Sequence, residues 1–167
     1  MPRSFDTSVE SPASVEQFLS AFGNEDYWQA RLAAGDSTAT LKSFTVDADS
    51  TVSVVFAASL LRDRLPKLIT QLHRGDLEVL QNERWSRIDG GRLRGEISVA
   101  APGTPLSGFW VVLARPVRSG SRLNYTVTVK VNVPLVGGTI ESIIGGQLAK
   151  GVTEGVRFTT DWIAENC

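Results

Sequence analysis

The chain has 167 residues, of which 42% are hydrophobic and 21% are charged, values typical of one globular domain over residues 1–167. Its net charge is −1 and its basic residues are scattered, which argues against a nucleic-acid-binding surface. His73 is the only histidine and Cys167 the only cysteine, which excludes an internal disulfide and a multi-histidine metal site, and we expect no cofactor.

The N-terminal segment contains a strand and two short helices. Residues 1–10 contain acidic side chains and no apolar stretch, so they do not look like a signal peptide. Residues 3–10 alternate as a strand does. Ser14 has the position of an N-cap for a helix over residues 14–22, and a second helix is predicted over residues 25–34.

The middle of the chain consists mainly of strand patterns. A helical insert is predicted over residues 61–73. His73 lies in its last turn, where interaction with the helix dipole explains this histidine without a catalytic role. Short turns rich in Asp and Gly separate most of the segments. The six strands predicted here cover residues 37–46, 51–60, 77–88, 92–99, 106–115 and 123–133.

A long amphipathic helix is predicted over residues 138–165. Its apolar stripe contains Ile140, Ile144, Leu148, Phe158 and Trp162, spaced as on one helical face. Gly151 and Gly155 fall at the centre of this stripe, and Gly145 falls at its edge. No run approaches the ~18 apolar residues of a membrane span, so we expect a cytoplasmic protein without an integral membrane segment.

The two central glycines need an explanation, because glycine inside a helix costs roughly 0.5–1 kcal/mol relative to alanine. One interpretation is close packing, in which a bulky residue of the sheet such as Trp110 or Tyr125 fills the gap. The other is a cavity, in which the missing side chains leave space for a ligand. The sequence leaves both open.

The order of the elements predicts an α+β fold in which a curved antiparallel sheet of about seven strands grips the long helix. This helix-grip arrangement resembles that of the START-like (SRPBCC) superfamily, which includes the birch-pollen allergen and polyketide cyclases. Members of that superfamily usually have a cavity between the sheet and the helix. The resemblance therefore implies a binding site for an apolar small molecule.

Two segments carry a closer resemblance, to an actinobacterial family of unknown function within this superfamily. The segment SFDTSVESPASVEQFLSAFGNEDYWQARL at residues 4–32 is similar to the start of that family. The segment GGTIESIIGGQL at residues 137–148 is similar to its C-terminal helix. The resemblance spans the chain and implies a fold, but no activity that could be carried over.

Several residues expected on the inner face are candidates for the wall of the cavity. Glu83 shares a strand face with Trp85, so a regular strand turns it inward, where a carboxylate must be paired or neutral. It is then a candidate acid, base or ligand anchor, unless a bulge reverses the register. We assign no catalytic residue. The predicted ligand-binding residues are Phe56, Glu83, Trp85, Trp110, Tyr125, Leu148, Gly151 and Gly155.

Three functions are compatible with this pattern. The leading hypothesis is a non-enzymatic binding protein for a lipid-like or aromatic molecule, because few ionisable groups are expected to face inward. The second is an enzyme similar to the polyketide cyclases and dehydratases, using the same cavity. The third is an interaction protein with a filled core.

One strand suggests a surface for self-association. Phe109, Val111 and Leu113 alternate with Trp110 and Val112, so both faces of this strand are apolar. If Trp110 faces the helix, the other three residues face outward. Soluble monomers rarely expose large apolar patches, and we therefore expect a weak homodimer through this strand, with cover by long neighbouring side chains as the alternative.

Overall fold

The inner face of a single seven-stranded antiparallel sheet holds the core of the protein. The computed structural model describes residues 3–35, 38–60, 67, 77–135 and 137–166. The strand order is β1-β7-β6-β5-β4-β3-β2. The strands are β1 (Arg3–Ser11), β2 (Thr38–Val46), β3 (Val52–Leu60), β4 (Leu77–Ile88), β5 (Arg92–Ala100), β6 (Leu106–Val117) and β7 (Gly120–Val131).

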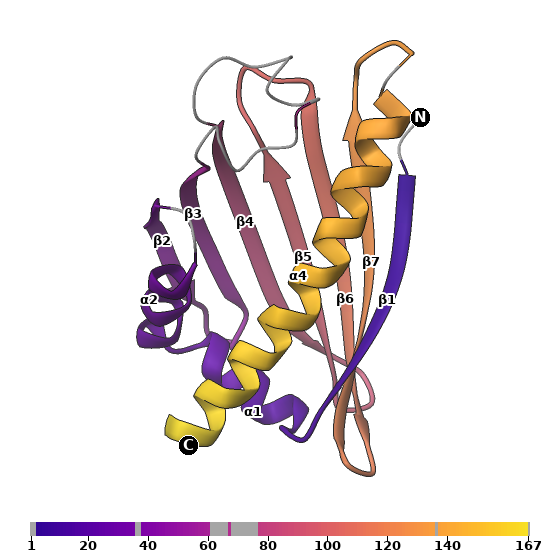
Figure 1. The fold of residues 1–167 in the computed structure, drawn as a ribbon. Coiled ribbons are helices and arrows are strands. Elements are labelled where there is room, and N and C mark those ends of the chain that lie inside the picture. The colour runs from indigo at the N-terminus through magenta and orange to yellow at the C-terminus, as the bar shows by residue number, and fades with distance from the viewer. Residues whose placement is uncertain (1–2, 36–37, 61–66, 68–76, 136, 167) are drawn as a thin grey trace.

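Three helices complete the described part of the fold. They are α1 (Val15–Phe22), α2 (Glu25–Ala34) and the long α4 (Gly137–Asn166). The sheet curves around α4, which crosses its inner face diagonally, while α1 and α2 lie toward the C-terminal end of α4 (Figure 1). The predicted helix-grip fold, with two short helices after the first strand, is confirmed.

The start of α1 follows from its first four residues. The backbone N–H of Gln17 donates to the Ser14 hydroxyl at 3.1 Å, and the Ser14 backbone N–H donates to the Gln17 side chain at 2.9 Å. This reciprocal pair satisfies two backbone donors that the first turn of a helix otherwise leaves free. The N-cap role predicted for Ser14 is confirmed.

The β6–β7 hairpin is longer than the alternation of residues predicts. Strands are predicted over residues 106–115 and 123–133, but pairing continues beyond their facing ends, to Val117 opposite Gly120. Gly120 has φ +144°, and a Cβ there would lie 2.2 Å from the Ser11 carbonyl oxygen. Glycine thus permits a backbone contact that no sequence pattern reveals. The helical insert predicted over residues 61–73, with His73, lies outside the described residues except for Lys67.

The face of α4 that meets the sheet differs from the predicted stripe. The ring of Phe5 in β1 packs where a side chain of Gly145 would lie, with Cε2 2.2 Å from an ideal Cβ. This contact turns Gly145, predicted at the edge of the stripe, toward the sheet, whereas Gly151, predicted at its centre, is exposed. The buried residues of α4 are Gly137, Ile140, Glu141, Gly145, Val152, Val156, Thr159 and Ile163.

Glu141 is a buried carboxyl group at the start of α4. Its side chain is 1% exposed, and its Oε2 accepts the backbone N–H of Val131 at 2.9 Å. This bond fixes the second turn of α4 to the end of β7. The other oxygen, Oε1, has no hydrogen-bond partner among the described residues.

The outer face of β6 is apolar, as the alternation predicts. Trp110 and Val112 are buried on the inner side, whereas Phe109 is 43% exposed and Val111 and Leu113 are half-buried.

Within the described ranges, no helix combines the length and the hydropathy that a membrane-spanning helix requires.

Candidate functional site

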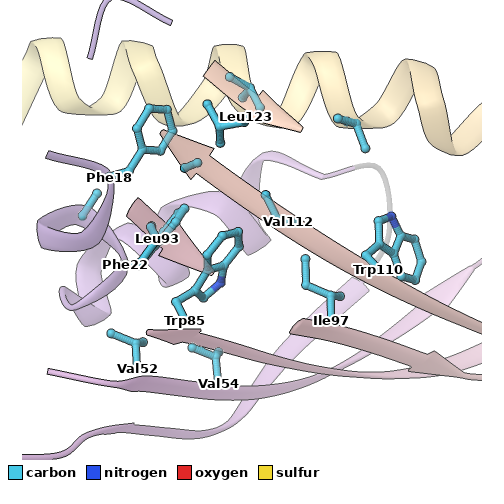
Figure 2. Packing of buried hydrophobic residues seen from close by; sticks show 14 of the residues in the cluster. Phe18, Phe22, Val52, Val54, Trp85, Leu93, Ile97, Trp110, Val112 and Leu123 are labelled. Carbon is cyan, nitrogen blue, oxygen red and sulfur yellow. The ribbon is translucent and has the colours of Figure 1, made fainter. Parts of the chain in front are cut away.

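A cavity of about 270 Å³ lies between the sheet, α4 and the two short helices. Phe18 and Phe22 of α1 close one side, and Trp85, Ile97 and Trp110 extend from the sheet toward α4 (Figure 2). The α4 side is formed by Gln147, Leu148, Gly151, Val152, Gly155, Val156 and Thr159. Arg31, Gln81 and Tyr125 add polar groups to the wall.

Six of the eight predicted ligand-binding residues line this cavity. They are Trp85, Trp110, Tyr125, Leu148, Gly151 and Gly155. The other two do not touch it. Phe56 is buried on β3 next to Gln81, and Glu83 lies behind the wall, bonded to two residues that form it. Pairing of β4 is regular on both sides, so no bulge reverses the inward direction of Glu83.

The glycines of α4 divide into two kinds. Gly145 is a packing contact with Phe5. At Gly151 and Gly155, an added Cβ would meet nothing within 4 Å, so neither Trp110 nor Tyr125 fills the space beside them. The expectation that both glycines lie at the centre of a buried stripe is wrong for Gly151, which is exposed where it borders the cavity. Gly155 is half-buried.

The aromatic wall of the cavity is held rigidly. The ring centroids of Phe22 and Trp85 are 4.4 Å apart, and a Cβ on Gly95 would lie 2.4 Å from the Trp85 ring. Only glycine at position 95 therefore leaves room for this indole on the inner face. Because Trp85 Nε1 also donates to Glu83 Oε2 at 2.9 Å, the indole is fixed at both its edge and its face.

The polar corner of the cavity is built around a buried ion pair. Glu83 is enclosed, with its side chain 0% exposed, and Arg31 Nη2 lies 3.6 Å from its Oε1. Gln81 Nε2 donates to the same oxygen at 2.6 Å. The Arg31 guanidinium lies over the Trp28 ring, 5.2 Å from its centroid, a favourable position for a cation. Burial alone would lower the pKa of Arg31, but Glu83, Tyr27 and Tyr125 together outweigh it and raise that pKa.

Two tyrosine hydroxyls lie near this corner. Burial raises the pKa of Tyr27 and of Tyr125, even though the Arg31 charge opposes the effect. The hydroxyls of Tyr27 and Thr159 are 2.6 Å apart, and Thr159 Oγ1 donates to the Gly155 carbonyl. The Thr159 proton is thus already used, so Tyr27 is the donor of the pair. This bond ties α2 to α4 beside the cavity.

Sequence reasoning missed the residues that α1 and α2 contribute. The sequence predicts helices over residues 14–22 and 25–34, but it assigns no role in a site to Phe18, Phe22 or Arg31 within them. A usable signal exists for Arg31, because it follows Trp28 by three residues and Tyr27 by four, which places all three side chains on neighbouring positions of one helix face. Tyr27 and Trp28 are both fully buried, so an arginine beside them is drawn toward the interior.

Comparison with known proteins shows the family. Residues 6–163 match the family model described as a protein of unknown function, DUF2505. The chain belongs to this family. An uncharacterised protein of Mycobacterium tuberculosis and one of Mycobacterium bovis are each 42% identical to it, over 99% of this chain and 99% of theirs. These relatives agree with the actinobacterial family predicted from residues 4–32 and 137–148.

Solved structures show the same fold at low sequence identity. Ara h 8.0201 matches 99% of this chain and 100% of its own, with a TM-score of 0.62 and 11% identity. A protein of Thermus thermophilus covers 100% of both chains with a TM-score of 0.56 and 13% identity. A Thalictrum norcoclaurine synthase, solved with a transition-state analogue, has a TM-score of 0.55 at 9% identity, over 99% and 96% of the two chains. These structures share the helix-grip fold of this chain.

Proposed function

We propose that this protein binds an apolar small molecule, aromatic or lipid-like, in the cavity between the sheet and α4. The observation that carries the proposal is the cavity of about 270 Å³, which the half-buried Gly155 borders with no atom within 4 Å of an added Cβ. Protein interiors are normally close-packed, and a mostly apolar cavity with a few convergent polar groups is the usual form of a small-molecule site.

The state of the polar groups supports binding rather than catalysis. Both carboxylate oxygens of Glu83 are engaged, one by Gln81 and Arg31 and the other by Trp85. A carboxylate held in this way is a poor general base. Burial raises the pKa of Tyr125, so at neutral pH its hydroxyl is a hydrogen-bond donor and not a nucleophile. An enzyme similar to the polyketide cyclases would need one of these groups to act on the bound molecule.

Native mass spectrometry of the protein purified from its own host tests the proposal. We expect a retained small molecule on the wild type and its loss in Gly155→Leu, because the new side chain would occupy the cavity. The matched control is Gly146→Leu, since Gly146 also has open space around it but does not line the cavity. Retention of the same mass by folded Gly155→Leu would contradict the proposal.

A second candidate function is weak self-association through the outer face of β6. The supporting observation is the row of Phe109, Val111 and Leu113, of which Phe109 is 43% exposed. Polar residues of the neighbouring strands surround this row, among them Arg94, Glu96 and Thr126. A narrow apolar patch with a polar rim suits a small interface better than a large obligate one. The cytoplasmic location stays a prediction.

A further inference from the structure

The polar corner formed by Arg31, Glu83, Gln81 and Tyr125 indicates which chemical class of ligand the cavity can take. This inference rests on the proposed binding function and goes one step beyond it. A wholly apolar ligand would remove water from the guanidinium N–H groups that face the cavity without replacing it, which costs free energy. A ligand that fills the cavity must therefore satisfy Arg31 or leave it hydrated.

Arg31 has donors to offer to a ligand. A guanidinium carries five N–H donors, and the Arg31 side chain is 29% exposed and lines the cavity. Its contact with Glu83, at 3.6 Å, is longer than a hydrogen bond. The Tyr27 hydroxyl is a second neighbour of the guanidinium. Donors that face neither Glu83 nor Tyr27 remain available to an acceptor atom in the cavity.

Glu83 already supplies the charge that balances Arg31. Among the described residues that line the cavity, together with Glu83 behind them, Arg31 and Glu83 are the only ionic side chains. The carboxylate cannot turn away when a ligand enters, because Gln81 and Trp85 hold its two oxygens and Gly95 and Phe22 hold the Trp85 ring. Glu83 therefore stays beside the Arg31 guanidinium when a ligand enters.

The donors of Arg31 favour a ligand with an acceptor atom, whereas the nearby Glu83 carboxylate disfavours a ligand with a negative charge. A neutral carbonyl oxygen can accept from Arg31 without bringing a second negative charge into the corner. A carboxylate would share the one guanidinium with Glu83 and would be repelled by the Glu83 carboxylate at short range. We propose that the cavity takes a neutral molecule with a carbonyl acceptor, bonded to Arg31, and that Glu83 determines specificity by excluding anions.

Three two-ring probes of similar shape separate these contributions. Benzophenone has a carbonyl, diphenylmethane has none, and diphenylacetate has a carboxylate. Binding is followed by NMR through the indole N–H signals of Trp85 and Trp110, which line the cavity. For the wild type we expect benzophenone to bind about tenfold more tightly than diphenylmethane, the value of one hydrogen bond to a charged group. Diphenylacetate should bind most weakly.

Glu83→Gln tests the role of the carboxylate. This substitution removes the charge and keeps groups that can bond to Trp85 and Gln81, and the same spectra show whether the variant is folded. We expect diphenylacetate to gain at least about tenfold in affinity relative to benzophenone. The matched control is Glu96→Gln, which removes the same charge from an exposed pair with Arg94 on the outer face. It should leave the ranking unchanged.

The outcomes distinguish this inference from the function on which it rests. If none of the three probes shifts the Trp85 or Trp110 signals, the binding function itself is contradicted, and the inference with it. If the probes bind but wild-type protein takes diphenylacetate as tightly as benzophenone, the charge selection is overturned while the binding function stands. Equal affinity for benzophenone and diphenylmethane would overturn the role of Arg31, and an unchanged ranking in folded Glu83→Gln would overturn that of Glu83.

Discussion

Glu83 shows how a carboxylate can be kept inside an apolar core. Its side chain is enclosed, and three groups on two elements compensate for the lost water: the Trp85 indole and the Gln81 amide on its own strand, and the Arg31 guanidinium from α2. Burying such a pair costs several kcal/mol per ion before any attraction is counted. The ion pair is therefore weak evidence for a stabilised fold. Removing either partner alone, however, leaves the other charge in the interior without its counter-charge.

Arg31→Met should destabilise the protein by about 3–5 kcal/mol, because it leaves the Glu83 charge buried without a cation. Adding Glu83→Gln to this variant should recover part of the loss. Urea unfolding followed by tryptophan fluorescence measures both. As a control, Arg94→Met breaks only an exposed pair with Glu96 and should cost under ~1 kcal/mol. A loss in Arg31→Met no greater than in Arg94→Met would mean that the ion pair does not hold the corner together.

Tyr27 and Tyr125 are the only tyrosines of the chain, and burial raises the pKa of both. In the unfolded chain they ionise near a pKa of about 10. Above that pH the unfolded state loses protons that the native state keeps, so stability should fall by about 1.4 kcal/mol per pH unit for each tyrosine. Below it, the contribution of these groups is fully present.

Absorbance at 295 nm, which reports tyrosinate, checks this expectation. The native protein should show little tyrosinate at pH 10 and should ionise only together with unfolding, whereas the protein in guanidinium chloride should titrate as free tyrosine does. Tyr125→Phe assigns the signal between the two residues. Ionisation of the folded protein with a midpoint near pH 10 would show that the hydroxyls are accessible to water.

The glycines of α4 provide a comparison within one element. Gly151→Ala should stabilise the protein by up to about 0.5–1 kcal/mol, because the new methyl group meets no neighbour and the helix loses its most flexible residue. Gly145→Ala should destabilise it by about 1–3 kcal/mol, because the methyl group would overlap the Phe5 ring. Thermal unfolding of the two variants should shift in opposite directions; a shift in the same direction would contradict the packing of α4 on β1.

The elements could be predicted because each depends on local pattern. Local strand patterns and the turns between them predict the seven strands, Ser14 as N-cap predicts the start of α1, and helical spacing predicts α4. The face of α4 that packs on the sheet could not be predicted, because the apolar stripe of this helix is broad. The contact that orients α4 joins Phe5 to Gly145, 140 residues apart in the sequence. The extra length of the β6–β7 hairpin depends in the same way on contact between Gly120 and Ser11.

The candidate site was predicted only where it belongs to the sheet and α4. Strand alternation predicts that Trp85 and Tyr125 face inward without any tertiary information, whereas both faces of the strand with Trp110 are apolar and alternation alone does not orient it. Arg31 was missed because a lone arginine on a short helix normally lies in solvent, and only the docking of α2 brings it to Glu83. The periodicity of the sequence predicts which face of a strand or helix a residue lies on. Which polar groups meet depends on the packing of elements that are distant in the sequence, such as α2 and β4.

For the molecule as a whole, the outer face of β6 predicts a concentration-dependent assembly. We expect the wild type to self-associate weakly in the micromolar range and Val111→Lys to remain monomeric, because a charge in the centre of a small apolar patch opposes its burial. Sedimentation velocity of both proteins measures this, with Thr126→Lys as a control at the rim. Monomers at every concentration would remove the hypothesis of an interface.

The pairing of β1 with β7 has a consequence for how the protein is made. Arg3 lies opposite Val129, and α4 packs on these same two strands, so the first strand has no partner until nearly all of the chain has been synthesised. Such non-local contacts slow folding to milliseconds or seconds. During translation the inner face of the sheet, with Trp85 and Trp110, is exposed until α4 emerges, and nascent chains of this protein should therefore be substrates for chaperones on the ribosome.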